Sequence, residues 1–321
     1  MRLSRRHATL SLAALACPAL LPTSFSARAE DAPRELRIGY QKIGLLVVAR
    51  QQRLIERRLA ARNIPVRWVE FTAGPPLLEA MAVGSIDFGY AGDAPPIFAQ
   101  AAGASIAYVA ATPPSGDGEG ILVKEASPIR TLADLRGRKV AFTRGSSAHN
   151  MTVAALEKSG LGYADISPVF LSPADAAAAF ARDSIDAWTI WDPFFALAQA
   201  RNRVRVLATG TQIKNSNSFL LANRGFADRF PETLGEVLVA LEEAARWASD
   251  NRGQVAASLA EVTGVELAAQ TVAAERGSFG VLPLSEAVLA TQQDSADRFQ
   301  RLGLIPCAVT VRDAVWSAAR R

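Results

Sequence analysis

Short apolar strands alternate with helical segments over residues 36–223 of this 321-residue chain, and this alternation constrains the fold more than any other feature. Residues 36–40 form an apolar run, 45–62 carry apolar residues at helical spacing, and 66–71 alternate at period two. The same order continues with helices expected at 75–81 and 95–102 and strands at 86–90 and 106–111. Such alternation favours a mostly parallel, doubly wound sheet, so an α/β fold is predicted.

A segment rich in turn-forming residues, 112–120, interrupts this pattern, and the alternation then starts again. From Gly225 onward the chain is almost wholly helical, with helices expected at 231–249, 251–262, 266–276 and 285–302. We therefore predict two α/β lobes and a helical C-terminal tail, with a ligand cleft between the lobes. Residues 30–119 and 224–321 are assigned to lobe I and 120–223 to lobe II, with chain crossings near Gly120 and Asn223.

The first 29 residues have the features of an export signal. Arg5 and Arg6 precede an apolar stretch, 8–21, and Ala27-Arg28-Ala29 forms a small-residue cleavage site. The apolar stretch is shorter than the roughly 20 residues that span a bilayer. We therefore predict an exported, periplasmic protein, and the paired arginines leave both the twin-arginine and the general secretory route open.

Cys17 raises the alternative of a lipoprotein anchor. We disfavour this alternative because Ala14 stands where a leucine is expected three positions upstream, and Pro18 follows the cysteine. A secreted protein without a lipid anchor is the expectation that remains.

The charge and cysteine content exclude several classes of function. The chain has 35 basic and 31 acidic residues, and residues 1–29 hold four of the basic ones and no acid, which leaves 31 of each. A near-neutral protein without a basic stripe is not expected to bind nucleic acid. Beyond the signal one cysteine, Cys307, and one histidine, His149, remain, so neither an internal disulfide nor a zinc site is expected, and no cofactor is predicted.

Small and polar residues gather in the loops that follow the expected strands, where ligands bind in open α/β sheets. The sharpest of these loops is Gly145-Ser146-Ser147, because its hydroxyls and the N–H groups of the helix that follows can donate hydrogen bonds to an anion. A serine N-cap without any ligand is the alternative. A second helix start, Gly92-Asp93-Ala94, is expected to face the same cleft and favours the ligand hypothesis.

Two tryptophans and one histidine are further candidates. Trp188 and Trp191 flank the end of an expected strand beside Asp192, where indole rings suit an organic group attached to an anion. For Trp188 a core position is an equal alternative. His149 lies in the first turn of the helix after Ser146, where the helix dipole disfavours its charged form, so a neutral ligand-contacting or capping role is expected.

The sequence offers little for catalysis. It has no nucleophile elbow, P-loop or dinucleotide fingerprint, and His149 is too near Ser146 on one helix start to serve a catalytic triad. A cysteine nucleophile could only be Cys307, in the tail, and Asp93 with Asp192 does not by itself make a glycosidase site. We therefore predict that the protein is not an enzyme.

Several segments resemble the periplasmic substrate-binding proteins of aliphatic sulfonate ABC transporters, within a superfamily that also includes nitrate, taurine and thiamine-precursor binders. The matching segments span nearly all of the chain beyond the signal: 39–42, 68–75, 84–89, 92–101, 134–142 and 187–193. The resemblance implies a type II periplasmic-binding-protein fold, whose two lobes close on the ligand about a hinge. It also implies delivery of the ligand to a permease and ATPase at the inner membrane, for sulfur acquisition.

Carried over by position, the resemblance implies that nine residues bind the ligand: Gln41, Asp93, Ala94, Ser146, Ser147, His149, Trp188, Trp191 and Asp192. Ala94 stands where the family often has threonine, which puts the preference among sulfonates in doubt. We expect a monomer that holds the sulfonate by neutral donors rather than by a salt bridge. A binder of taurine, nitrate or a pyrimidine stays open, as does a desulfinase of the same fold, although the cysteine that such enzymes use early in the chain is lacking.

Overall fold

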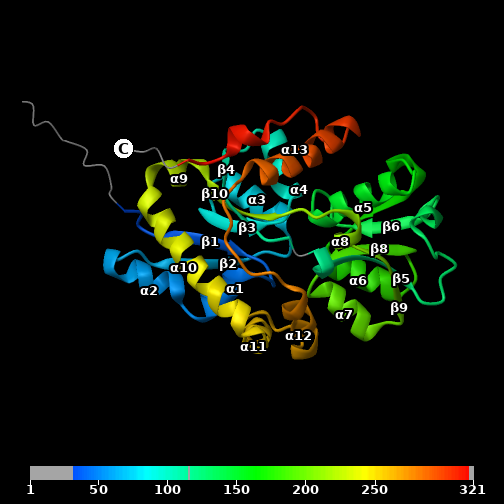
Figure 1. Cartoon of the computed structure of the whole chain (residues 1–321), viewed down its shortest axis with the longest axis horizontal. Coiled ribbons are helices and arrows are strands. Elements are labelled where there is room, and N and C mark those ends of the chain that lie inside the picture. The colour runs from blue at the N-terminus through cyan, green and yellow to red at the C-terminus, as the bar shows by residue number, and fades with distance from the viewer. Residues whose placement is uncertain (1–31, 115, 318–321) are drawn as a thin grey trace, which may run out of the picture. The chain divides into compact units, whose positions relative to one another are not determined.

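A computed structural model describes residues 32–114 and 116–317, so the expected signal peptide and Cys17 lie outside the described residues. Two five-stranded sheets, each flanked by helices, make up the fold (Figure 1). Within this described part of the chain, no helix is both long and apolar enough to cross a membrane.

The first sheet has the strand order β2-β1-β3-β10-β4. Strand β1 pairs in parallel with β2 and β3, whereas β10 runs antiparallel to both β3 and β4. Its strands are β1 (Leu36–Tyr40), β2 (Val66–Glu70), β3 (Phe88–Ala91), β4 (Ile106–Thr112) and β10 (Ser218–Asn223). The helices between them are α1 (Leu45–Gln51), α2 (Leu54–Leu59), α3 (Gly74–Ala82) and α4 (Ala94–Ala101).

The single helix expected over 45–62 is divided. It breaks at Arg53, whose left-handed backbone (φ 54°) separates α1 from α2, and the segment ends in a 3₁₀ turn at 60–62. A left-handed residue cannot continue a right-handed helix. Neither glycine nor proline marks this break, so the sequence pattern did not indicate it.

The second sheet repeats this plan with the order β7-β6-β8-β5-β9. Strand β6 is parallel to β7 and β8, and β5 is antiparallel to β8 and β9. Its strands are β5 (Glu119–Lys124), β6 (Lys139–Phe142), β7 (Ser167–Phe170), β8 (Ala187–Trp191) and β9 (Val204–Thr209). The helices after β6, β7 and β8 are α5 (Ser147–Lys158), α6 (Pro173–Ala181) and α7 (Phe194–Arg201).

The chain passes between the two sheets twice, over 113–118 and over 210–217, the second passage starting with the short helix α8 (Gly210–Ile213). The passages touch each other, because a Cβ atom on Gly116 would lie 2.5 Å from the backbone nitrogen of Thr211, and one on Gly210 would lie 2.7 Å from the Gly116 carbonyl oxygen. Strand β10 follows the second passage and pairs within the first sheet. The predicted assignment of residues 218–223 to lobe II is therefore wrong.

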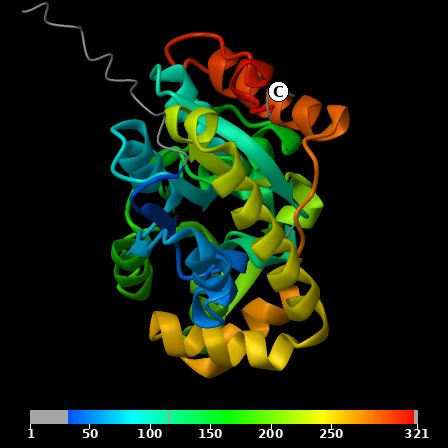
Figure 2. The ribbon, with the colours of Figure 1, turned by 90° about the vertical axis from the view of Figure 1, so that its left-hand side faces the viewer.

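Beyond β10 the chain forms helices, as predicted: α9 (Arg224–Arg229), α10 (Pro231–Asp250), α11 (Arg252–Thr263), α12 (Leu267–Arg276) and α13 (Glu286–Arg301). Helices α10 and α11 pack with α1 and α2 in one apolar cluster, and α13 packs with α3 and α4 in another (Figures 1 and 2). The tail helices thus complete both faces of the first sheet.

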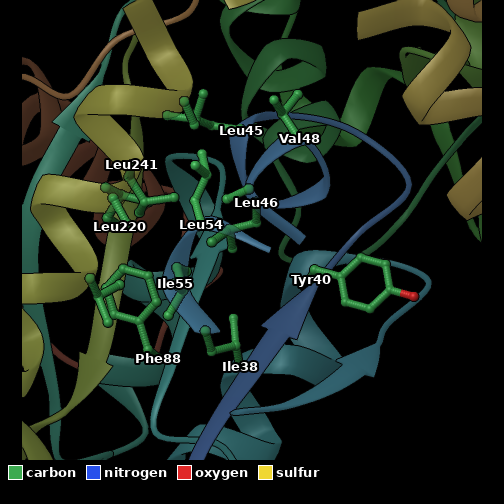
Figure 3. Close-up of a cluster of buried hydrophobic side chains, with 14 of the residues drawn as sticks. Ile38, Tyr40, Leu45, Leu46, Val48, Leu54, Ile55, Phe88, Leu220 and Leu241 are labelled. Carbon is green, nitrogen blue, oxygen red and sulfur yellow. The ribbon is translucent and has the colours of Figure 1, made fainter. Parts of the chain in front are cut away.

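The core follows the alternation of side chains along each strand. On β10, Leu220 faces the cluster of α1, α2 and α10, and Leu221 faces the cluster of α3, α4 and α13. Figure 3 shows Phe88 and Leu220 beside Ile55 of α2 and Leu241 of α10, while the hydroxyl of Tyr40 points away from these aliphatic side chains. Because both faces of the sheet are covered, only the strand ends are free to build a site.

Candidate functional site

A cavity of about 130 Å³ lies at the strand ends of both sheets and against the two passages that join them. A single water takes roughly 10–15 Å³ on this measure, so the cavity can hold several waters or a small organic molecule. Six of the nine predicted site residues line it: Gln41, Asp93, Ser146, Ser147, Trp191 and Asp192. The neighbouring lining residues include Gly92, Gly118, Glu119, Lys214, Ser216 and Asn217.

The loop before α5 holds an open helix start. Gly145 has a positive φ of 70°, which a side chain would strain, and a Cβ atom there would lie 3.3 Å from the ring of Phe98. Ser146 is the N-cap: its hydroxyl donates to the Thr143 carbonyl at 2.6 Å and accepts from the His149 N–H. Ser147 lines the cavity, and no acceptor among the described residues takes the N–H groups of Ser147 and Ala148. Two donors of this helix start are therefore available to an anion.

The start of α4 lies next to it but is closed. A Cβ atom on Gly92 would lie 2.8 Å from the Ser147 Cβ, so the two loops are in contact. The Ala94 N–H donates to the Asp93 carboxylate at 2.8 Å, and the next two residues are prolines, which have no N–H. The first helical residues of α4 therefore offer no free N–H group to a ligand.

Asp93 is instead the centre of a buried polar network. Its Oδ2 accepts hydrogen bonds from the Asn150 amide, the Lys214 ammonium and the Ser216 hydroxyl, each at 2.7 Å. Although burial alone would raise the pKa of Asp93, Lys214 and these hydrogen bonds hold it below its ordinary value. Asp93 therefore joins the first sheet, helix α5 and the second passage of the chain.

Lys214 was not among the predicted residues, and it brings a full positive charge to the cavity. Its ammonium contacts Asp93, the Ser216 hydroxyl at 2.9 Å and Glu119 Oε2 at 3.3 Å, so all three of its protons have acceptors. Burial opposes its charge, but the two carboxylates raise the pKa of Lys214 overall. The polar run around Lys214 was a signal in the sequence, but its partner Asp93 lies 121 positions away.

Glu119 was also missed, and it stands at the first position of β5, opposite Trp191 in the antiparallel ladder. Side chains at opposed positions of such a ladder share one face of the sheet, about 5 Å apart at Cβ. Glu119 is 8% exposed. Burial, opposed by Lys214, raises the pKa of its carboxyl group. The cavity wall therefore holds an indole ring beside a poorly solvated carboxylate.

Asp192 follows β8 and has a weaker set of partners than Asp93. Its Oδ1 accepts from the Ala196 N–H at 2.9 Å and lies 3.4 Å from Arg276, whose other nitrogen bonds Gln199 at 2.6 Å. Burial raises the pKa of Asp192 to about 6, and Arg276 only partly offsets this effect. Arg276 belongs to α12, so this pair connects the helical tail to the second sheet.

Gln41, at the end of β1, reaches the cavity from the first sheet. Its side chain is 6% exposed and donates through Nε2 to the Tyr90 carbonyl at 3.0 Å. This hydrogen bond fixes the amide and leaves its second N–H group and its oxygen for a ligand.

Three predicted residues lie outside the cavity lining. Trp188 is in the middle of β8, where it packs in the core with its ring 5.8 Å from that of Phe180. Of the two tryptophans, only Trp191, at the strand end, reaches the cavity. Ala94 is fully buried against the core of the first sheet.

His149 is the third predicted residue outside the cavity lining, and it is enclosed by aromatic rings. It stacks on Phe142 at 4.8 Å, its Nδ1 accepts from the Gly145 N–H, and its Nε2 lies 3.2 Å from the Tyr163 hydroxyl. Burial, with Arg144 nearby, lowers the pKa of His149 to about 3. The ring is therefore neutral, and it caps the loop rather than facing the cavity.

The described residues contain no group of three or more His, Cys, Asp or Glu side chains arranged to hold a metal ion. The residues that line the cavity include neither histidine nor cysteine. The arrangement is suited to binding a ligand, because it offers N–H and hydroxyl donors at α5, an indole ring in the wall, and a set of buried charges.

A family model described as "ABC transporter, phosphonate, periplasmic substrate-binding protein" matches residues 54–273. The chain therefore belongs to this family of ABC-transporter substrate-binding proteins. An aliphatic sulfonates-binding protein of Escherichia coli (strain K12) is 45% identical over 307 residues, which cover 94% of this chain and 95% of the relative.

Two solved structures agree with this assignment. The alkanesulfonate-binding protein SsuA from Xanthomonas axonopodis pv. citri, bound to MOPS, is 44% identical with a TM-score of 0.85, and covers 89% of this chain and 99% of its own. The periplasmic aliphatic sulphonate binding protein SsuA from Escherichia coli is 43% identical with a TM-score of 0.82. The match covers 90% of this chain and 94% of that structure's chain. The fold class expected from the resemblance is confirmed.

Proposed function

We propose that this protein is the periplasmic solute-binding protein of an ABC importer and that it binds aliphatic sulfonates in the cavity between its two sheets. The observation that carries the proposal is the open start of α5, where Ser147 lines the cavity and neither its N–H group nor that of the next residue, Ala148, has an acceptor among the described residues. The relatives that match nearly the whole chain support the choice of anion. MOPS, which the Xanthomonas relative binds, is itself an organic sulfonate.

The sulfonate head lies at the start of α5, where it accepts from the N–H groups of Ser147 and Ala148 and from the Ser147 hydroxyl. The positive end of the helix dipole stabilises its charge. Trp191 covers the organic part, and Gln41 closes the cavity from the first sheet. The head is thus held by neutral donors, since Asp93 and Glu119 already neutralise the Lys214 ammonium.

The two sheets, with their helices, act as lobes that close on the ligand, and the described residues of the two passages, 113–114 with 116–118 and 210–217, form the hinge. The close contact of Gly116 with Gly210 supports this placement of the hinge, because the two passages can bend together. The closed protein presents the sulfonate to its permease and ATPase at the inner membrane. It acts as a monomer, and residues 1–29 direct its export.

The protein releases its ligand unchanged. A desulfinase needs a nucleophile in the cavity, but the lining residues include no cysteine, and Cys307 is exposed and lies after the last long helix. His149, the general base that a serine nucleophile would require, is enclosed by aromatic rings.

Calorimetric titration of the protein expressed from Glu30 onward tests the proposal. Linear alkanesulfonates should bind with 1:1 stoichiometry and raise the melting temperature, whereas sulfate and nitrate should bind at least tenfold more weakly because they lack an organic group for Trp191. Binding of nitrate or a pyrimidine in preference to every sulfonate would contradict the proposal. So would release of sulfite from a sulfinate.

A further inference from the structure

Two residues that line the cavity, Glu119 and Asp192, each have a buried carboxylate oxygen without a hydrogen-bond partner. Seven buried side-chain polar atoms among the described residues lack one, and of these only Glu119 Oε1 and Asp192 Oδ2 belong to residues that line the cavity. The Ser147 hydroxyl lies close enough to Glu119 to lower the pKa of its carboxyl group, but it forms no hydrogen bond with Oε1. A buried acceptor without a donor costs about 1–3 kcal/mol, and more when it is charged.

The charges around the cavity do not balance. Asp93, Glu119 and Asp192 face Lys214 and Arg276, so the ionised set carries one net negative charge. Asp93 is fully satisfied by its hydrogen bonds, and the excess therefore resides on Glu119 and Asp192. A sulfonate that enters this space adds a second negative charge in a poorly solvated site, where like charges repel strongly.

A positive group on the ligand removes both problems at once. An ammonium N–H can donate to Glu119 Oε1 and Asp192 Oδ2 in charge-assisted hydrogen bonds. Trp191, opposite Glu119 in the ladder, also lines the cavity, and the face of an indole ring attracts cations. Ser147, Glu119 and Asp192 all line the same cavity, so one ligand can carry the anion for α5 and the cation for the two carboxylates.

We infer that the preferred ligands are zwitterionic sulfonates, in which a protonated amine is joined to the sulfonate by a short chain, and that Glu119 is the residue that selects them. This inference rests on the proposed sulfonate site and deepens it. Asp192 assists Glu119 from the neighbouring loop. A plain alkanesulfonate binds at the same site but leaves both oxygens without a donor.

The test compares 3-aminopropanesulfonate with butanesulfonate, two ligands of equal length that differ by an ammonium in place of a methyl group. Calorimetry at pH 8 keeps the carboxylates ionised. The aminosulfonate should bind at least tenfold more tightly to the wild-type protein. In Glu119→Gln this advantage should fall to less than threefold, mainly through weaker binding of the aminosulfonate, while Glu125→Gln, a change at an exposed residue, should retain it.

Equal or tighter binding of butanesulfonate to the wild-type protein would overturn the inference and leave the proposed function intact. Equal losses for both ligands in Glu119→Gln would overturn the role of Glu119. Asp192→Asn provides a second variant if Glu119→Gln does not fold, and a smaller loss confined to the aminosulfonate is expected from it. No heat from either sulfonate would contradict the proposed function itself.

Discussion

The helix starts at α4 and α5 look alike in sequence but differ in what they leave open. Each follows a strand through a glycine-containing loop, and the two loops touch at Gly92 and Ser147. At α4, the Asp93 carboxylate takes the N–H group of Ala94, and Pro95 and Pro96 have none. At α5, Ser146 caps one donor, and two more remain for a ligand.

The difference shows that a helix start binds an anion only where no side chain already satisfies its N–H groups. Asp93 satisfies the start of α4 and also holds Lys214, Asn150 and Ser216. The start of α4 is therefore structural, because Asp93 joins the sheets and the chain passage, while the open start of α5 is the proposed recognition element. Substitutions can therefore test the structural role of the α4 start and the recognition role of the α5 start separately.

The largest expected effect is on stability, from Asp93→Asn. The change leaves the buried Lys214 ammonium with Glu119 as its only charged partner, and loss of one member of a buried pair costs about 3–5 kcal/mol. Urea unfolding should show a loss of this size, whereas Asp228→Asn, at an exposed residue, should change the free energy of unfolding by less than about 0.5 kcal/mol. Equal effects of the two changes would show that α4 is not held by Asp93.

Asp192 offers a contrast to Asp93, because its pKa is raised rather than lowered. With a folded-state pKa of about 6 against 3.8 for the free group, the folded protein keeps a proton that the unfolded chain has lost. Its contribution to stability is therefore present below about pH 4 and is lost as the pH rises to about 6. At about 1.4 kcal/mol per unit of pKa shift, the loss is up to about 3 kcal/mol.

Unfolding of the wild-type protein and Asp192→Asn between pH 4 and 7 measures this contrast. The free energy of unfolding of the wild-type protein should fall relative to that of the variant over this range. Parallel curves would show that Asp192 ionises with an ordinary pKa, as an exposed carboxyl group does.

Closing the open start should abolish recognition without loss of fold. Ser147→Pro removes the N–H and the hydroxyl at the first helical position, which proline tolerates well, and so makes α5 resemble α4. We expect sulfonate affinity to fall about 100-fold, or about 2.8 kcal/mol. Ser147→Ala keeps the N–H and should lose less than tenfold, so similar losses in both variants would assign recognition to the hydroxyl instead.

The two tryptophans of β8 give the smallest expected effect on binding. Trp191→Ala removes the cavity wall and should weaken alkanesulfonate binding by about tenfold, or about 1.4 kcal/mol. Trp188→Phe is a core substitution and should leave affinity unchanged in calorimetry. A loss of affinity in Trp188→Phe that matches the loss in Trp191→Ala would mean that both rings reach the ligand.

Local patterns in the sequence predicted most of the fold. Both sets of alternating elements and the four long tail helices are present within a few residues of the expected positions, because apolar periodicity records which face of each element is buried. Strand β10 was misassigned because its place depends on pairing with β3 and β4, more than 100 positions earlier in the chain. Adjacency in sequence could not reveal that pairing.

The cavity lining was predicted where a single loop supplies the residues, and it was missed where residues from distant parts of the chain meet. Ser146 and Ser147 were visible from their glycine and helix start, whereas Lys214 and Glu119 matter only through partners on other elements. Two of the wrong predictions could have been avoided from the sequence alone. The prolines after Ala94 indicate a start with few donors, and the position of Trp188 in the middle of its strand favours the core.

A crystal structure of the protein with butanesulfonate tests the open helix start most directly. The account predicts that the sulfonate oxygens lie within about 3 Å of the Ser147 and Ala148 nitrogens, with the alkyl chain against Trp191. A sulfonate bound instead by the Lys214 ammonium or at the start of α4, with the α5 donors left unused, would contradict it.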